Sequence, residues 1–358
     1  MASADSLRPA PLIPSRNPTR VTTKPEPDIE ANSPPPSPHC RSAFIPGFID
    51  PPPFLTFLRH SWFDIATQLL CLLIAYLVYT FCPPIMPRYF PLYPGVEKSD
   101  WGIKHSQPYM KEYVDTNVSA ALGFCGPALV MGAIALWGTR RFEDGNAALV
   151  GLGYALSTAT LFQILIKIFI GGLRPHFLSI CKPRLPPSLR MSSFPGSQVG
   201  FYTAKQVCTG DEDKIKEAQM SFPSGHACAA FAGFGFLALF LNAKYKIFSR
   251  GGHFRQHYGT RAEREAEHEH VGDSTQRVRH WKLVLFVAPW CIAVVLALSK
   301  MRDGWHHPVD LVFGSLLGTF FAHMAYKMVY RSVYDEETNH IPCGRAGAET
   351  VEEGVKVA

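Results

Sequence analysis

The sequence predicts an all-α protein, a bundle of six transmembrane helices. Of the 358 residues, 47% are hydrophobic and only 18% are charged, and the hydrophobic residues are concentrated in blocks. Six of these blocks reach or approach the roughly 20 apolar residues that a helix needs to cross a bilayer. Short clusters of Lys, Arg, His and Asp lie at the edges of these blocks, where ionisable groups indicate function.

The predicted core covers residues 61–331 and is flanked by two tails. Residues 1–60 are rich in Pro and residues 332–358 are rich in Glu, so we expect both to be disordered and cytosolic. The first 50 residues lack the apolar core of a cleavable signal peptide, and we expect the first span to direct insertion. The six spans are predicted at about residues 62–83, 117–137, 147–170, 222–241, 281–299 and 307–327.

The distribution of Lys and Arg predicts which side of the membrane each loop faces. Arg140 and Arg141 separate the second and third spans, and several Lys and Arg follow the fourth span. The positive-inside rule makes both loops cytosolic. Residues 84–116, 171–221 and 300–306 then face the lumenal or extracellular side of an unidentified membrane. We therefore expect one active site at the non-cytosolic membrane edge.

Two loops allow alternatives that the sequence leaves open. Cys181 and Cys208 fall in the same non-cytosolic loop, where they can form a disulfide or remain as thiols. Residues 250–280 are rich in Arg, Glu and His and predict a solvated cytosolic loop, with metal binding by the histidines as the alternative.

The first polar cluster, KIFIGGLRP, ends the third span. Lys167 and Arg174 are seven residues apart, or two helical turns, so both side chains can contact one anion. Taken alone, Lys167 could instead be an anchor that extends its ammonium to the interface.

The second cluster, PSGH, precedes the fourth span. Ser224 is predicted as the N-cap of that helix, and the unpaired amides of a first helical turn attract phosphate oxygens. His226 could protonate a departing alkoxide. An ordinary capped helix is the alternative, but it does not explain a histidine at the membrane edge.

The third cluster, SKMRDGWHHPVD, joins the last two spans. His306 and Asp310 have i, i+4 spacing, so the carboxylate can accept a hydrogen bond from one ring nitrogen and leave the other as a nucleophile. A His–Asp pair that caps the last span and a metal site are the alternatives, although no dense carboxylate set completes the latter. We expect no chemical role for His307.

In this order, the three clusters resemble the signature of the phosphatidic acid phosphatase type 2 superfamily: K-x6-R-P, P-S-G-H and S-R-x5-H-x3-D. The resemblance covers about residues 60–330, and both KIFIGGLRPHFLSIC and HHPVD are similar to the lipid phosphate phosphatase branch. It implies that His306 attacks phosphorus to form a phosphohistidine, that Asp310 orients it, and that His226 protonates the leaving group. No metal or other cofactor would be required. The phosphate-binding residues would be Lys167, Arg174, Ser224, Gly225 and Lys300.

Lys300 departs from this signature, because the family has Arg after Ser299. Lysine keeps the charge but lacks the planar fork that grips two oxygens at once, so phosphate binding could be weaker or substrate choice shifted. Spacing alone does not decide whether Arg302 compensates.

The resemblance implies a lipid phosphate as the partner: phosphatidic acid, lysophosphatidic acid or diacylglycerol pyrophosphate. We expect no nucleic acid to bind, and the oligomeric state stays open. An isoprenoid or dolichyl diphosphate phosphatase is the alternative enzyme, and a non-catalytic lipid-binding relative is the alternative outside enzymes. A transporter or channel would place its charges in mid-span rather than at span ends.

Overall fold

The computed structural model describes residues 48, 52–184, 200–248 and 279–343. Six helices in this part of the chain are long and apolar enough to cross a membrane, which confirms the six predicted spans. Nearly all of the histidine-rich loop and most of both predicted tails lie outside the described residues, so those predictions remain there. Of the described tail residues, 54–60 belong to α1, and Asn339 is buried and accepts a hydrogen bond from Tyr326, so the prediction of disorder does not hold for them. The six helices are α1 (Phe54–Phe81), α3 (Thr116–Ala133) with a π-helical extension (Ile134–Thr139), α4 (Phe142–Phe169), α9 (Gly225–Tyr245), α11 (His280–Arg302) and α12 (Pro308–Val329).

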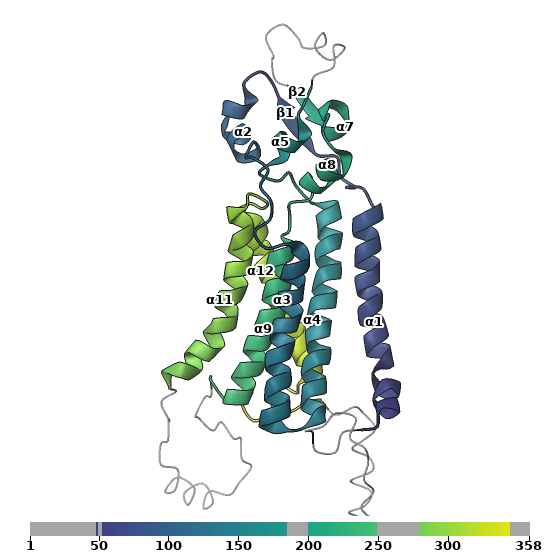
Figure 1. Ribbon diagram of the computed structural model, residues 1–358, viewed down its shortest axis with the longest axis vertical. Coiled ribbons are helices and arrows are strands. Elements are labelled where there is room, and N and C mark those ends of the chain that lie inside the picture. The colour runs from purple at the N-terminus through teal and green to yellow at the C-terminus, as the bar shows by residue number, and fades with distance from the viewer. Residues whose placement is uncertain (1–47, 49–51, 185–199, 249–278, 344–358) are drawn as a thin grey trace, which may run out of the picture. The chain divides into compact units, whose positions relative to one another are not determined.

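Helix α9 is the central element of the bundle. It packs against α3, α4, α11 and α12, whereas α1 packs against α4 (Figure 1). Glycines permit the closest approaches. A Cβ atom on Gly318 of α12 would lie 2.3 Å from the Cys228 carbonyl oxygen of α9, and one on Gly233 of α9 would lie 2.0 Å from the Gly123 carbonyl oxygen of α3. The first contact holds the N-terminal half of α9 against α12, and the second holds α9 against α3.

A small folded unit, which we call the cap, is built from residues 89–105 and the described part of 171–221. Strand β1 (Tyr89–Leu92) pairs antiparallel with β2 (Gly200–Thr203). Phe90 and Phe177 meet edge to face with ring centroids 5.0 Å apart, in a core separate from that of the bundle. A disulfide joins Cys181 to Cys208, which resolves the alternatives left open above. The cap also contains a 3-10 turn (Val96–Lys98) and the helices α2 (Asp100–His105), α5 (Phe177–Cys181), α7 (Ala204–Val207) and α8 (Glu212–Ala218).

Residues 106–115, which we call the strap, connect α2 of the cap to α3 of the bundle. Hydrogen bonds fasten the strap to the segments that carry the first and third polar clusters. Gln107 N donates to Pro175 O at 3.0 Å, Trp305 Nε1 donates to Met110 O at 3.0 Å, and Tyr113 N donates to Asp303 Oδ2 at 2.7 Å.

Candidate active site

The three polar clusters meet where α4 and α11 end and where α9 and α12 begin. Backbone hydrogen bonds join the segments: Ser221 N donates to Gly172 O at 3.0 Å, and Ser224 N donates to Asp310 O at 3.1 Å. The chain can turn back at the end of α4 because Gly171 and Gly172 adopt φ angles of 54° and 128°, a region that favours glycine.

His226 lies near the middle of the assembled groups. This residue of the second cluster is within electrostatic range of Lys167 and Arg174 from the first cluster and of Lys300 and His306 from the third. The structure therefore brings together every ionisable residue that the sequence predicted for the site.

His306 and Asp310 form the most buried pair of the site. Their side chains are 2% and 8% exposed, and His306 Nδ1 lies 3.7 Å from Asp310 Oδ2, an ion-pair rather than a hydrogen-bond distance. Burial lowers the pKa of His306 to about 3, and the Asp310 carboxylate opposes this shift. The imidazole is therefore neutral at physiological pH and keeps a lone pair available for nucleophilic attack.

The Asp310 carboxylate is held by donors that the sequence analysis did not include. Its Oδ2 accepts hydrogen bonds from Ser221 Oγ at 2.5 Å and from His307 N at 2.9 Å. The His307 side chain in turn accepts from the Asp310 backbone amide, so the two residues form a capping box at the start of α12. This structural contact accounts for His307 without a chemical role.

Ser224 is the N-cap of α9, as predicted. Its side chain is buried and accepts a hydrogen bond from the Ala227 amide at 3.4 Å. Gly225 is the first residue of the helix, and Gln163 of α4 holds the preceding turn by donating to the Pro223 carbonyl oxygen at 3.3 Å. The amides of this first turn, with the positive end of the helix dipole, can bind an anion.

Arg174 and Lys167 are both buried. The Arg174 guanidinium lies over the Trp305 ring, 4.5 Å from its centroid, and Nη2 lies 3.4 Å from Glu217 Oε1. Burial lowers the pKa of Arg174, but a guanidinium starts so high that it remains charged. Arg88, which the sequence analysis missed, caps α4 through Nη2, 3.4 Å from the Lys167 carbonyl oxygen.

Lys300 is fully buried, with its ammonium turned toward the strap. Its Nζ donates to Glu112 Oε2 at 2.8 Å and also to the Val114 carbonyl oxygen. The exposed Arg302 guanidinium lies over the Tyr113 ring, 4.8 Å from its centroid. Arg302 therefore contacts the strap and does not substitute for an arginine at position 300.

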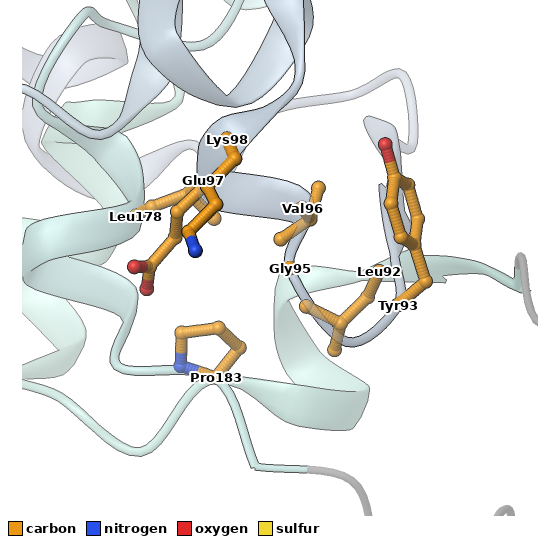
Figure 2. A pocket seen from close by; sticks show the side chains of 8 residues that line it. All are labelled: Leu92, Tyr93, Gly95, Val96, Glu97, Lys98, Leu178 and Pro183. Atoms are coloured by element: carbon orange, nitrogen blue, oxygen red, sulfur yellow. The ribbon is translucent and has the colours of Figure 1, made fainter.

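A cavity of about 290 Å³ lies elsewhere, in the cap (Figure 2). None of its lining residues is a predicted site residue. Separately from this cavity, no group of three or more His, Cys, Asp or Glu side chains within the described ranges is arranged to hold a metal ion. The residues that line the cavity are Leu92, Tyr93, Gly95, Val96, Glu97, Lys98, Leu178 and Pro183.

A sequence model of the PAP2 superfamily matches residues 148–334, more than half of the chain and all three clusters. The chain belongs to the PAP2 superfamily. As a family member with six apolar helices, it is a multi-pass membrane protein.

Several curated relatives resemble the chain. A PA-phosphatase related-family protein of Dictyostelium discoideum is 28% identical over 238 residues, covering 66% of this chain and 62% of the relative. Probable lipid phosphate phosphatase 4 of Arabidopsis thaliana is 30% identical over 197 residues, covering 55% and 52%. Diacylglycerol pyrophosphate phosphatase 1 of Saccharomyces cerevisiae is 27% identical over 235 residues, covering 64% and 69%. The chain thus spans between half and two thirds of the length of the first two relatives. No solved structure matches the chain.

Proposed function

We propose that the protein is an integral membrane phosphatase that removes a phosphomonoester or terminal pyrophosphate group from a diacylglycerol-type lipid. Phosphatidic acid, lysophosphatidic acid and diacylglycerol pyrophosphate are the proposed substrates. Family membership and the names of the relatives support this substrate class.

The observation that carries the proposal is a set of buried polar nitrogens without partners. Among the described residues, Arg174 Nε, Arg174 Nη1 and His226 Nε2 have no hydrogen-bond partner. Each buried unpaired polar group costs about 1–3 kcal/mol. A phosphate group offers several acceptor oxygens to the Arg174 donors and a leaving-group oxygen to His226, so it would satisfy these groups together.

In the proposed reaction, His306 acts as the nucleophile. Its Nδ1 faces Asp310, so Nε2 attacks phosphorus; a P–N bond forms while the P–O bond to the lipid breaks. His226 donates a proton to the departing oxygen. Water then attacks the phosphohistidine, His226 takes up the proton of that water, and inorganic phosphate leaves. The Asp310 carboxylate stabilises the positive charge on His306 while it is phosphorylated.

The remaining site residues would bind the phosphate oxygens and balance their charge. Lys167 and Arg174 supply positive charge from the end of α4, while Ser224 and Gly225 supply the start of α9. Lys300 adds positive charge from the end of α11, through an ammonium that is bound to Glu112. Such preorganised charge is usually the largest contribution to phosphoryl transfer, and no metal or other cofactor is part of the proposal.

We place this site on the lumenal or extracellular side of the membrane. The Cys181–Cys208 disulfide in the cap supports this side, because disulfides persist in oxidising compartments. The Lys and Arg content of the opposite loops supports it independently.

Phosphate release from phosphatidic acid tests the proposal. Protein purified in detergent should release phosphate in the presence of EDTA, and His306→Ala should abolish the release. His323→Ala is a matched control, because His323 lies within α12 and its ring is hydrogen-bonded to the Thr319 carbonyl oxygen of the same helix.

Three outcomes would contradict the proposal. Full activity of His306→Ala would show that His306 is not the nucleophile. Complete dependence on added metal would contradict the metal-independent mechanism. Release from a polyprenyl diphosphate without release from diacyl lipids would favour the alternative phosphatase, whereas no release from any lipid phosphate would favour a non-catalytic relative.

A further inference from the structure

We propose that Glu112 of the strap is a positioning residue for the leaving-group step, acting through His226. Its carboxylate lies 3.8 Å from His226 Nε2, too far for a hydrogen bond, so it would favour the protonated ring by charge alone and leave the Nε2 proton for the lipid oxygen. The inference rests on the proposed function.

Glu112 lies between two of the predicted site residues. Its Oε2 is 2.8 Å from Lys300 Nζ and 3.8 Å from His226 Nε2, and its side chain is only 14% exposed. Thr116, in the first turn of α3, also donates to Oε2, at 3.3 Å. An ammonium and a hydroxyl therefore fix the same carboxylate oxygen that lies nearest to His226.

The strap supports this placement on both sides of Glu112. Met110 accepts a hydrogen bond from the Trp305 ring, and Tyr113 N donates to the Asp303 carboxylate. Both anchors belong to the turn that carries His306. A shift of that turn would move Glu112 with it, which keeps the carboxylate in register with the catalytic residues.

The charge around His226 explains why a carboxylate is needed there. Lys300 faces it from α11, Lys167 from α4, Arg174 from the segment after α4, and His306 from the turn before α12. The three cations oppose a positive charge on the ring, by Coulomb's law. Among the described residues, Glu112 is the carboxylate that lies within 4.0 Å of the ring, and it counteracts them.

This role predicts an effect that depends on the leaving group. The alkoxide of a diacylglycerol is a poor leaving group and requires a proton, whereas a nitrophenolate leaves without one. General acid catalysis contributes typically about 10²–10⁴-fold. Losing the support for His226 should therefore slow alkyl phosphate hydrolysis selectively.

The experiment compares two substrates in detergent: phosphatidic acid and the phosphate ester of a long-chain alkyl nitrophenol. For Glu112→Gln, we expect kcat/KM to fall at least 10-fold with phosphatidic acid and less than threefold with the nitrophenyl ester. Glu97→Gln, an exposed carboxylate of the cap, is the matched control and should leave both values unchanged. Equal losses with the two substrates would indicate a merely structural role and overturn the inference, as would no loss with either.

A second variant keeps the test decisive if Glu112→Gln does not fold. Glu112→Asp withdraws the carboxylate by one methylene from its 3.8 Å approach to His226. We expect the kcat/KM for phosphatidic acid, divided by the kcat/KM for the nitrophenyl ester, to fall at least threefold. An unchanged ratio would overturn the inference. The proposed function fails separately, if the wild-type protein releases no phosphate from lipid.

Discussion

Replacing Lys300 by the arginine of the family signature should lower both the stability and the activity of this protein. Lys300 is 0% exposed, and its ammonium is already bound by Glu112 Oε2 at 2.8 Å and by the Val114 carbonyl oxygen. A guanidinium is larger and planar, and it does not fit a space shaped for a compact ammonium. Forcing extra atoms into a packed interior costs about 1–3 kcal/mol, which we expect as the loss in free energy of unfolding for Lys300→Arg.

The same substitution should also reduce activity, because a displaced Glu112 no longer lies beside His226. If the entire cost were expressed in the transition state, kcat/KM would fall by about 5- to 150-fold, since 1.36 kcal/mol is a factor of ten. This range is an upper limit, because part of the strain can relax through the strap.

Thermal unfolding in detergent and phosphate release from phosphatidic acid would measure the two effects of Lys300→Arg. Lys104→Arg is the matched control, because Lys104 lies exposed on α2 and such surface changes usually stay within about 0.5 kcal/mol. A Lys300→Arg protein at least as stable and as active as the wild type would refute the reasoning, since it would mean that the buried ammonium does not hold the strap.

Two further predictions concern groups around the site. Ser221→Ala removes a 2.5 Å hydrogen bond to the buried Asp310 carboxylate, so it should lower the free energy of unfolding by about 1.5–3 kcal/mol and slow phosphate release; unchanged denaturation and activity would contradict this. Burial lowers the pKa of His176 to about 4, whereas the unfolded ring titrates near 6.5. Between these values the unfolded state binds more protons, so stability should rise from pH 4 to about 6.5 and gain nothing from this group above. Between pH 4 and 6.5, the melting temperature of His176→Gln should rise less steeply with pH than that of the wild type. An equal slope would show that the His176 ring does not contribute to this pH dependence.

The spans were predictable because bilayer thickness determines the length of an apolar helix. Five predicted spans start and end within about five residues of the observed helices. Helix α1 is the exception: it begins at Phe54, about eight residues before the predicted start. Arg59 and His60 lower the hydropathy of this first part, but neither residue breaks a helix. Composition therefore predicted the apolar stretch correctly and the helix start less well.

The cap and the strap were not predictable by the same reasoning. The cap contains helices and strands of four to seven residues, too short for a hydrophobic period to appear. Their stability comes from contacts distant in sequence, such as Phe90 with Phe177 and the disulfide. Glu112 precedes its neighbours Lys300 and His226 by more than 100 residues, and a single Glu in a polar segment carries no spacing signal.

The Lys300–Glu112 pair also changes how the departure from the family signature is understood. From sequence, we expected Lys300 either to bind phosphate more weakly than arginine or to shift the choice of substrate. In the structure two of the three ammonium N–H groups already donate, to Glu112 and to Val114, so at most one remains for a phosphate oxygen. A buried carboxylate that loses its partner is strongly destabilised. We therefore expect the unpaired Arg174 donors to make the main direct contacts with phosphate. Lys300 acts mainly indirectly, by fixing the Glu112 carboxylate that lies beside His226.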